Sequence, residues 1–128
     1  MTTQPKSLPR VKRGSLGAIA VTLLPVQKIK AHSPRGVSFE QEIHEFLVTN
    51  FNGYTVSSGS ISGHWKDDAG HDHYGEHRQY KVAATPESRP SLEVFLADLA
   101  RETDEDCIYL EFAGEIALIY RSTESAPS

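Results

Sequence analysis

The stretch from Ser62 to Arg78 holds many of the side chains in this chain that could do chemistry. Four of the six histidines and the single tryptophan lie in it. Imidazole nitrogens bind zinc, copper or nickel, which makes His64, His71 and His73 a candidate site for a divalent metal ion. A hairpin that turns at Asp68 and Ala69 would place His64 opposite His73 on one face of a sheet.

The same stretch fits two other interpretations. A slip of one residue in the hairpin moves His64 to the opposite face and separates the histidines. Polar turn residues also gather at hairpin tips simply because those tips are solvated, and this reading predicts no specific metal site. Acid–base chemistry by a histidine is the third alternative. No motif in the chain demands a cofactor, so a divalent metal is the single cofactor candidate.

Other catalytic motifs are absent from the sequence. It has no glycine-rich phosphate loop and no Gly-x-Ser-x-Gly elbow. Cys107 is the only cysteine, so no disulfide can form within the chain. Its place at the start of an apolar run predicts a small core residue and not a nucleophile. A chain without disulfides is typical of the cytoplasm, which is the expected location.

Charge is distributed unevenly along the chain. Residues 1–36 contain seven Lys or Arg and no acid, whereas residues 37–128 contain six basic and seventeen acidic side chains. Residues 37–128 carry a net negative charge that repels the phosphates of nucleic acid, so nucleic acid is not an expected partner. The basic segment 1–15 is interpreted as a flexible tail. The apolar run at 16–26 is too short to span a bilayer, and a strand explains it better than a secretory signal, so no membrane partner is expected.

The elements that must position these side chains follow from periodicity and turn residues. An apolar stripe at helical spacing from Leu92 to Ala100 predicts a helix that is capped at Ser91 and ends near Thr103. A further helix is predicted at 39–50, where Ser38 stands at the N-cap position. Strands are predicted at 16–29, 54–65 with a bulge at 58–59, 76–85, 107–112 and 115–120.

This order predicts an α+β fold, a ferredoxin-like β-α-β-β-α-β sandwich with one extra C-terminal strand. One domain is expected at 16–121, between a basic tail at 1–15 and a loose tail at 122–128. Two helices can cover only one face of such a sheet. The other face is predicted to be bare and to drive association into a homo-oligomer. The residues assigned to that bare face are Tyr80, Val82, Leu110 and Leu118.

Four segments together resemble the PII-like superfamily of ferredoxin-like proteins, and more narrowly its phage-type S-adenosylmethionine lyases. They are FNGYT at 51–55, SGHWKDD at 62–68, GEHRQYKV at 75–82 and EDCIYLEFAGEIALIY at 105–120. Trp65 matches an aromatic position near the end of the family's second strand, Glu76 an acidic residue that opens the third, and Asp106-Cys107 a later strand. The lyases carry a tyrosine where this chain has Trp65.

The resemblance implies a homotrimer that holds an adenine-type small ligand in clefts between subunits. In such a cleft Trp65 would stack on the ligand, and Arg78, Tyr80 and Lys81 would bind it. A lyase that forms methylthioadenosine and homoserine lactone is the alternative, with Glu76 as its catalytic residue. An indole lacks a phenolic hydroxyl, which favours a binding module over an enzyme.

Overall fold

The middle of the sheet is formed by β1 (Ala18–Pro25) in the computed structural model, which describes residues 10–123. The strand ends at Pro25, whereas the sequence predicted a strand to Ile29. Pro25 has φ −61° and forms the N-cap of a single helical turn, α1 (Val26–Ile29). Proline lacks an N–H for the sheet and is suited by its φ to a helix start, so it converts the end of the predicted strand into α1.

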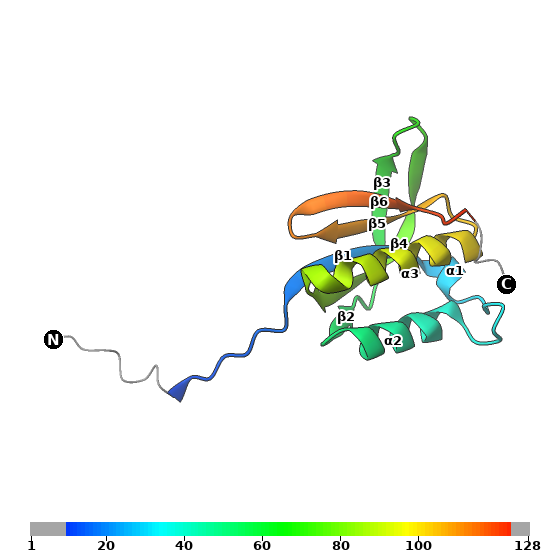
Figure 1. Cartoon of the computed structure of the whole chain (residues 1–128). Helices are drawn as coiled ribbons and strands as arrows, with labels where there is room; N and C mark the ends of the chain where they lie inside the picture. The colour runs from blue at the N-terminus through cyan, green and yellow to red at the C-terminus, as the bar shows by residue number, and fades with distance from the viewer. Residues whose placement is uncertain (1–9, 124–128) are drawn as a thin grey trace.

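All strand pairs are antiparallel, and the strand order is β2-β4-β1-β5-β6 (Figure 1). The predicted strand at 54–65 is split in two, and both parts pair with β4, the first near its end and the second near its start. This α+β architecture with a six-stranded sheet is compatible with a ferredoxin-like sandwich. The remaining strands are β2 (Tyr54–Val56), β3 (Ile61–Lys66), β4 (Asp72–Ala84), β5 (Cys107–Phe112) and β6 (Glu115–Tyr120).

Two long helices form where the sequence predicted them. The first, α2 (Phe39–Asn50), has the predicted bounds, and the Ser38 hydroxyl accepts a hydrogen bond from the backbone N–H of Gln41 at 3.0 Å. The second, α3 (Arg89–Glu102), begins before the predicted cap at Ser91. The 3-10 turn η2 (Pro86–Ser88) leads directly into α3. Pro90 is tolerated in the first turn of α3 because the N–H that it lacks would have no partner there.

Both long helices pack on the same face of the sheet, and the core lies between the two layers. Ile43 of α2 and Leu96 of α3 are each 1% exposed. Phe46 and Phe95 stack at 3.9 Å between ring centroids and join the two helices. Three of the residues predicted to lie on a bare sheet face were therefore assigned to the wrong face. Tyr80, Val82 and Leu110 are buried beneath the helices. Leu118 pairs with Tyr109 and lies on the opposite face.

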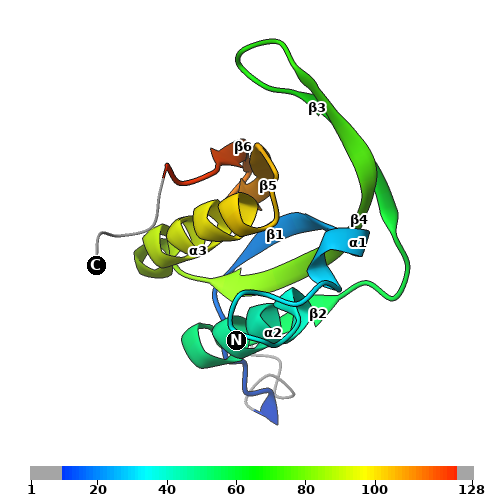
Figure 2. The same ribbon diagram turned by 90° about the vertical axis from the view of Figure 1, so that its right-hand side faces the viewer.

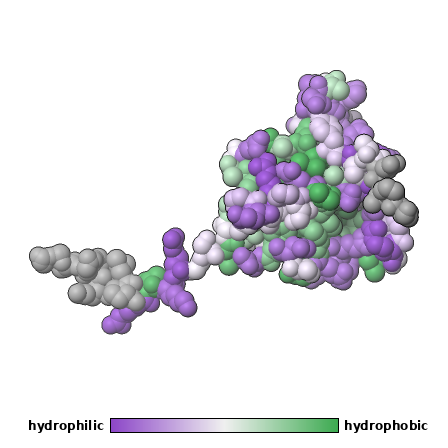
Figure 3. Space-filling view, in the orientation of Figure 1, coloured by the Kyte–Doolittle hydropathy of each residue, from purple (hydrophilic) through white to green (hydrophobic). Residues whose placement is uncertain are grey.

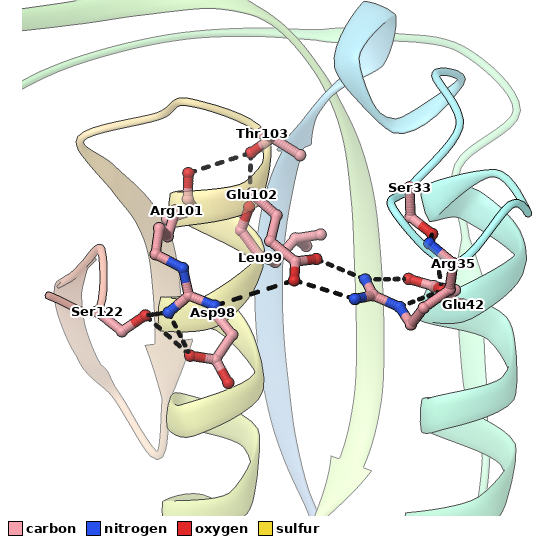
Figure 4. Close-up of polar contacts among 10 residues, drawn as sticks. Ser33, Arg35, Glu42, Asp98, Leu99, Arg101, Glu102, Thr103 and Ser122 are labelled. Atoms are coloured by element: carbon pink, nitrogen blue, oxygen red, sulfur yellow. Dashed lines mark hydrogen bonds and ion pairs between the residues drawn. The ribbon is translucent and has the colours of Figure 1, made fainter. Parts of the chain in front are cut away.

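A network of ion pairs also connects α2 to α3 (Figure 4). Arg35, from the loop before α2, contacts Glu42 of α2 at 2.7 Å and Glu102 of α3 at 2.5 Å. Arg101 extends the network to Asp98 and Ser122. Hydrogen bonds to both carboxylates raise the pKa of Arg35, and the one from Arg35 lowers the pKa of Glu42. The Arg35 side chain is half exposed, so each pair contributes modestly.

Residues 10–17 run away from the body of the molecule as an extended, exposed segment (Figure 1). The rest of the predicted N-terminal tail, residues 1–9, lies outside the described residues, as do residues 124–128 of the predicted C-terminal tail. Between residues 10 and 123, no helix has the length and apolar character needed to cross a bilayer.

Candidate functional site

The histidine-rich segment forms the hairpin β3–β4, but its register differs from the predicted one. Trp65 pairs with His73, and His64 pairs with Tyr74. The Asp67 carboxylate accepts hydrogen bonds from the backbone N–H groups of Ala69 and His71 at 2.9 and 2.8 Å. This Asx-type turn makes the loop longer than predicted and shifts the pairing by one residue. His64 and His73 consequently lie on opposite faces of the hairpin.

The predicted metal site of His64, His71 and His73 is not assembled in this register. His64 lies 3.3 Å from Asp72, whereas His73 Nε2 lies 2.8 Å from Asp67 Oδ2 and His71 Nδ1 lies 3.6 Å from the same oxygen. Within the described part of the chain, no group of three His, Cys, Asp or Glu side chains is placed to hold a metal ion.

The hairpin arches over the face of the sheet that the helices leave uncovered (Figure 2). Its tip is attached to the end of β6, where the Tyr120 hydroxyl donates to Asp68 Oδ1 at 2.7 Å and accepts from the Asp68 N–H at 3.1 Å. Below the tip, the Trp65 ring packs on His77 and Tyr109 with centroid distances of 5.1 and 5.4 Å. Sequence reasoning assigned no role to Tyr109 or Tyr120, because no local pattern indicates contacts between segments so far apart in the chain.

A polar pocket of about 180 Å³ lies between this hairpin and the sheet. Trp65, His73 and His77 line it from the hairpin, and Leu23 lines it from β1. Cys107 at the start of β5 closes the opposite side. The arch of the hairpin thus creates a pocket from three segments that are distant in sequence.

Two polar atoms at this pocket have no partner. Trp65 Nε1 and His77 Nδ1 are buried and have no partner within residues 10–123 at ordinary hydrogen-bond geometry. The Cys107 thiol lies near the Trp65 side chain, and the backbone of Gly75 and Ile61 lies near the His77 ring. His77 as a whole is only 7% exposed. A buried polar group without a partner costs on the order of 1–3 kcal/mol, so it needs an explanation. Arg78 Nε is the third such atom, but it belongs to the other face of β4.

The titratable groups at the pocket differ in charge: Asp67 is anionic, whereas His77 and Cys107 favour their neutral forms. The hydrogen bond from His73, followed by those from the backbone, lowers the pKa of Asp67 to about 2 and keeps this carboxylate, which lies behind His73, anionic. Burial lowers the pKa of His77 and favours the neutral imidazole. Burial also raises the pKa of Cys107 to about 11, so its thiol is protonated at neutral pH and is not a nucleophile. Glu105 also lines the pocket, but its charge is paired with Lys28 at 2.6 Å. The part of the pocket between Trp65 and His77 therefore suits hydrogen bonding with a neutral group.

The other predicted ligand-binding and catalytic residues lie elsewhere. Glu76 points to the outer face of the hairpin and accepts hydrogen bonds from the hydroxyls of Ser60 and Ser62 at 2.7 and 2.6 Å. These two bonds lower the pKa of Glu76. The predicted catalytic residue therefore does not meet Trp65 within one chain.

The predicted binding residues Arg78, Tyr80 and Lys81 are also divided between two faces. Arg78 lies on the helix side, 2.6 Å from Glu40 of α2. Tyr80 is 2% exposed in the core, and burial raises its pKa to about 12. Lys81 is exposed on the face opposite the helices. Of the predicted ligand-binding set, Trp65 alone lines the pocket beneath the hairpin.

No family model, curated protein or solved structure matches this chain.

Proposed function

We propose that this protein binds a small molecule with an adenine-type edge in the pocket beneath the hairpin. The observation that supports this function is the pair of buried, unpartnered atoms Trp65 Nε1 and His77 Nδ1. An indole N–H can only donate, whereas a neutral imidazole with its proton on Nε2 accepts at Nδ1. The edge of adenine offers a ring-nitrogen acceptor beside an amine donor, which complements this pair.

The size of the pocket limits what part of a ligand it can enclose. Its volume of about 180 Å³ is below the roughly 300–1,000 Å³ of pockets for drug-sized ligands. A single heterocycle is therefore the buried part, and any sugar or charged group of the ligand extends past Asp72 and Tyr74 at the rim.

The proposal includes a PII-like arrangement of the fold and assembly into a homo-oligomer. The order β2-β4-β1-β5, with β6 added at one edge, supports the first point. The incompletely covered sheet face supports the second. The resemblance of the sequence implies three copies. A cytoplasmic location belongs to the same proposal, since Cys107 is a buried free thiol.

Binding is preferred to S-adenosylmethionine cleavage because of where the carboxylates lie. Glu76 is directed away from the pocket and is engaged by two serine hydroxyls. Of the carboxylates that line the pocket, Glu105 is paired with Lys28 at 2.6 Å and Asp72 with Lys66 at 2.9 Å. The nearby Asp67 is bonded to His73 and to its own loop. Each of these carboxylates is therefore already engaged and is not free to meet a sulfonium beside Trp65.

Titration calorimetry with adenine, AMP, ATP and S-adenosylmethionine tests the proposal. We expect saturable binding of at least one of these compounds. Trp65→Phe and His77→Leu should each weaken it about tenfold, since each removes one hydrogen bond worth roughly 1–1.5 kcal/mol. His64→Ala, on the other face of the hairpin, is the matched control and should bind as the wild type does.

Two outcomes count against this function. One is the absence of saturable binding by all four compounds. The other is binding that both pocket variants leave unchanged while their melting curves show an intact fold. Mass spectrometry of the S-adenosylmethionine sample adds a separate readout, because methylthioadenosine that disappears with Glu76→Gln would favour the lyase.

A further inference from the structure

A second hollow, of about 360 Å³, lies at the end of the sheet away from the hairpin. The hairpin is formed by the start of β4, whereas the hollow is lined by Lys81, Val82 and Ala83 near the end of that strand. The first residues of β1 and β2 complete its lining. Its volume falls within the roughly 300–1,000 Å³ of small-molecule pockets. The hollow is therefore large enough for a ligand and is separate from the pocket beside Trp65.

The apolar wall of this hollow is held in place by contacts of its backbone. Leu16 and Ile19 are 58% and 63% exposed, so the described part of the chain leaves both side chains largely uncovered. Between them, Gly17 has φ +124° and approaches β4 so closely that a Cβ would lie 2.5 Å from the Ala84 carbonyl oxygen. The Asn52 side-chain amide also donates to the Leu16 carbonyl at 3.2 Å. An exposed apolar surface is thus fixed in position before any ligand binds.

Lys81 supplies the only charged side chain in the lining of the hollow. It is exposed and makes no ion pair within residues 10–123. A lysine can lay its hydrocarbon stem on apolar surface and keep its ammonium at the edge. The extended segment that leads to the hollow adds Arg10, Lys12 and Arg13 and no acid. Figure 3 shows hydrophilic side chains along this segment and apolar surface on the body below the polar hairpin tip. The charges at the hollow and along this segment are therefore all positive.

We infer that this hollow binds a small amphipathic carboxylate, such as a short fatty acid. The hydrocarbon chain displaces water from Leu16, Ile19 and Ala83, and the carboxylate pairs with the Lys81 ammonium at the edge. An uncharged apolar molecule leaves that ammonium without a partner, and an organic cation is repelled by it. This site is additional to the proposed adenine-type site and does not depend on it.

Titration calorimetry with octanoate, octanol and octylammonium tests the inference. We expect saturable binding of octanoate, binding of octanol that is at least about tenfold weaker, and no binding of octylammonium, because only the carboxylate pairs with Lys81. Butanoate should also bind at least about tenfold more weakly than octanoate, since it buries a shorter hydrocarbon chain.

Two variants locate the bound octanoate. Lys81→Gln should weaken its binding about tenfold by removing the cation. Ile19→Ala should weaken it about fivefold by removing apolar contact. Both side chains are exposed, so the melting curves should stay close to that of the wild type. Lys30→Gln changes an exposed lysine outside the lining of the hollow and is the matched control, which should bind octanoate as the wild type does.

Three outcomes would overturn this inference: no saturable binding of octanoate, equal binding of octanol and octanoate, or octanoate binding that Lys81→Gln and Ile19→Ala both leave unchanged. Trp65→Phe separates this site from the adenine-type site, because it should weaken the adenine compound and leave octanoate binding as it is. Binding of an adenine compound without octanoate contradicts this inference alone, and the reverse result contradicts the proposed function alone.

Discussion

Gly63 decides how Trp65 can lie in the hairpin. A Cβ at position 63 would overlap the indole ring of Trp65. Glycine therefore lets the ring fold back over its own strand, where it contacts His77 and Tyr109. The orientation of the one tryptophan thus depends on a missing side chain two residues earlier.

Replacing Gly63 by alanine should destabilise the protein and disturb the pocket. The new methyl group forces the indole to move, and overpacking of this kind typically costs about 1–3 kcal/mol. Urea denaturation should show this loss, and binding of the adenine-type ligand should weaken in parallel. Gly59→Ala is the control, because a Cβ there meets nothing within 4 Å. Equal stability of the two variants would contradict the packing of Trp65 on Gly63.

At the scale of elements, the hairpin β3–β4 is held at both of its ends. Its base continues into the sheet through β4, and its tip is held by Tyr120 at the end of β6. The pocket exists only while the arch stays over the sheet. The contact between Asp68 and Tyr120 is exposed, so it contributes little to global stability and acts mainly on the position of the tip.

Tyr120→Phe should therefore loosen the hairpin without unfolding the domain. We expect faster amide hydrogen exchange in residues 66–73 and a change of less than about 1 kcal/mol in the free energy of unfolding. Tyr74→Phe removes a hydroxyl from a 78% exposed side chain of the same hairpin and should leave exchange unchanged. Unaltered exchange in Tyr120→Phe would show that the tip is held by other contacts.

For the whole molecule, His77 and Asp67 are two of the groups that couple stability to pH. Burial holds the pKa of His77 below its ordinary 6.5, and hydrogen bonds hold that of Asp67 at about 2, below its ordinary 3.8. In both cases the unfolded chain binds protons more readily than the folded one. The free energy of unfolding therefore falls as the pH is lowered.

We expect this loss in two stages. The first stage begins as the pH drops below about 6.5, because His77 of the unfolded chain then gains a proton. The second stage extends from near pH 4 down to about 2, where Asp67 titrates. Urea denaturation at a series of pH values measures both stages. His77→Gln should flatten the first stage, and Asp67→Asn should reduce the second, to which other carboxylates of lowered pKa also contribute. His32→Gln, which changes an exposed histidine outside the hairpin, is the matched control for the first stage. A pH profile of His77→Gln that matches the wild type would contradict the assignment.

The sequence by itself determined the features that depend on neighbouring residues. The spacing of apolar side chains and the Ser38 cap predicted α2 to the residue, and the pair β5 and β6 followed from two apolar runs around Ala113 and Gly114. Both turn residues have positive φ, 54° and 87°, as a tight hairpin requires. From such elements the α+β architecture could be derived.

Only the tertiary structure decided which side chains meet at the pocket. One residue of register, controlled by the hydrogen bonds of Asp67, separates His64 from His73 and leaves Glu76 on the face opposite Trp65. Period-two alternation does not specify that register. The arch that brings Trp65 to Tyr109 and Asp68 to Tyr120 depends on contacts between distant segments. Such contacts leave no mark in local sequence patterns, because they form only after the sheet is assembled.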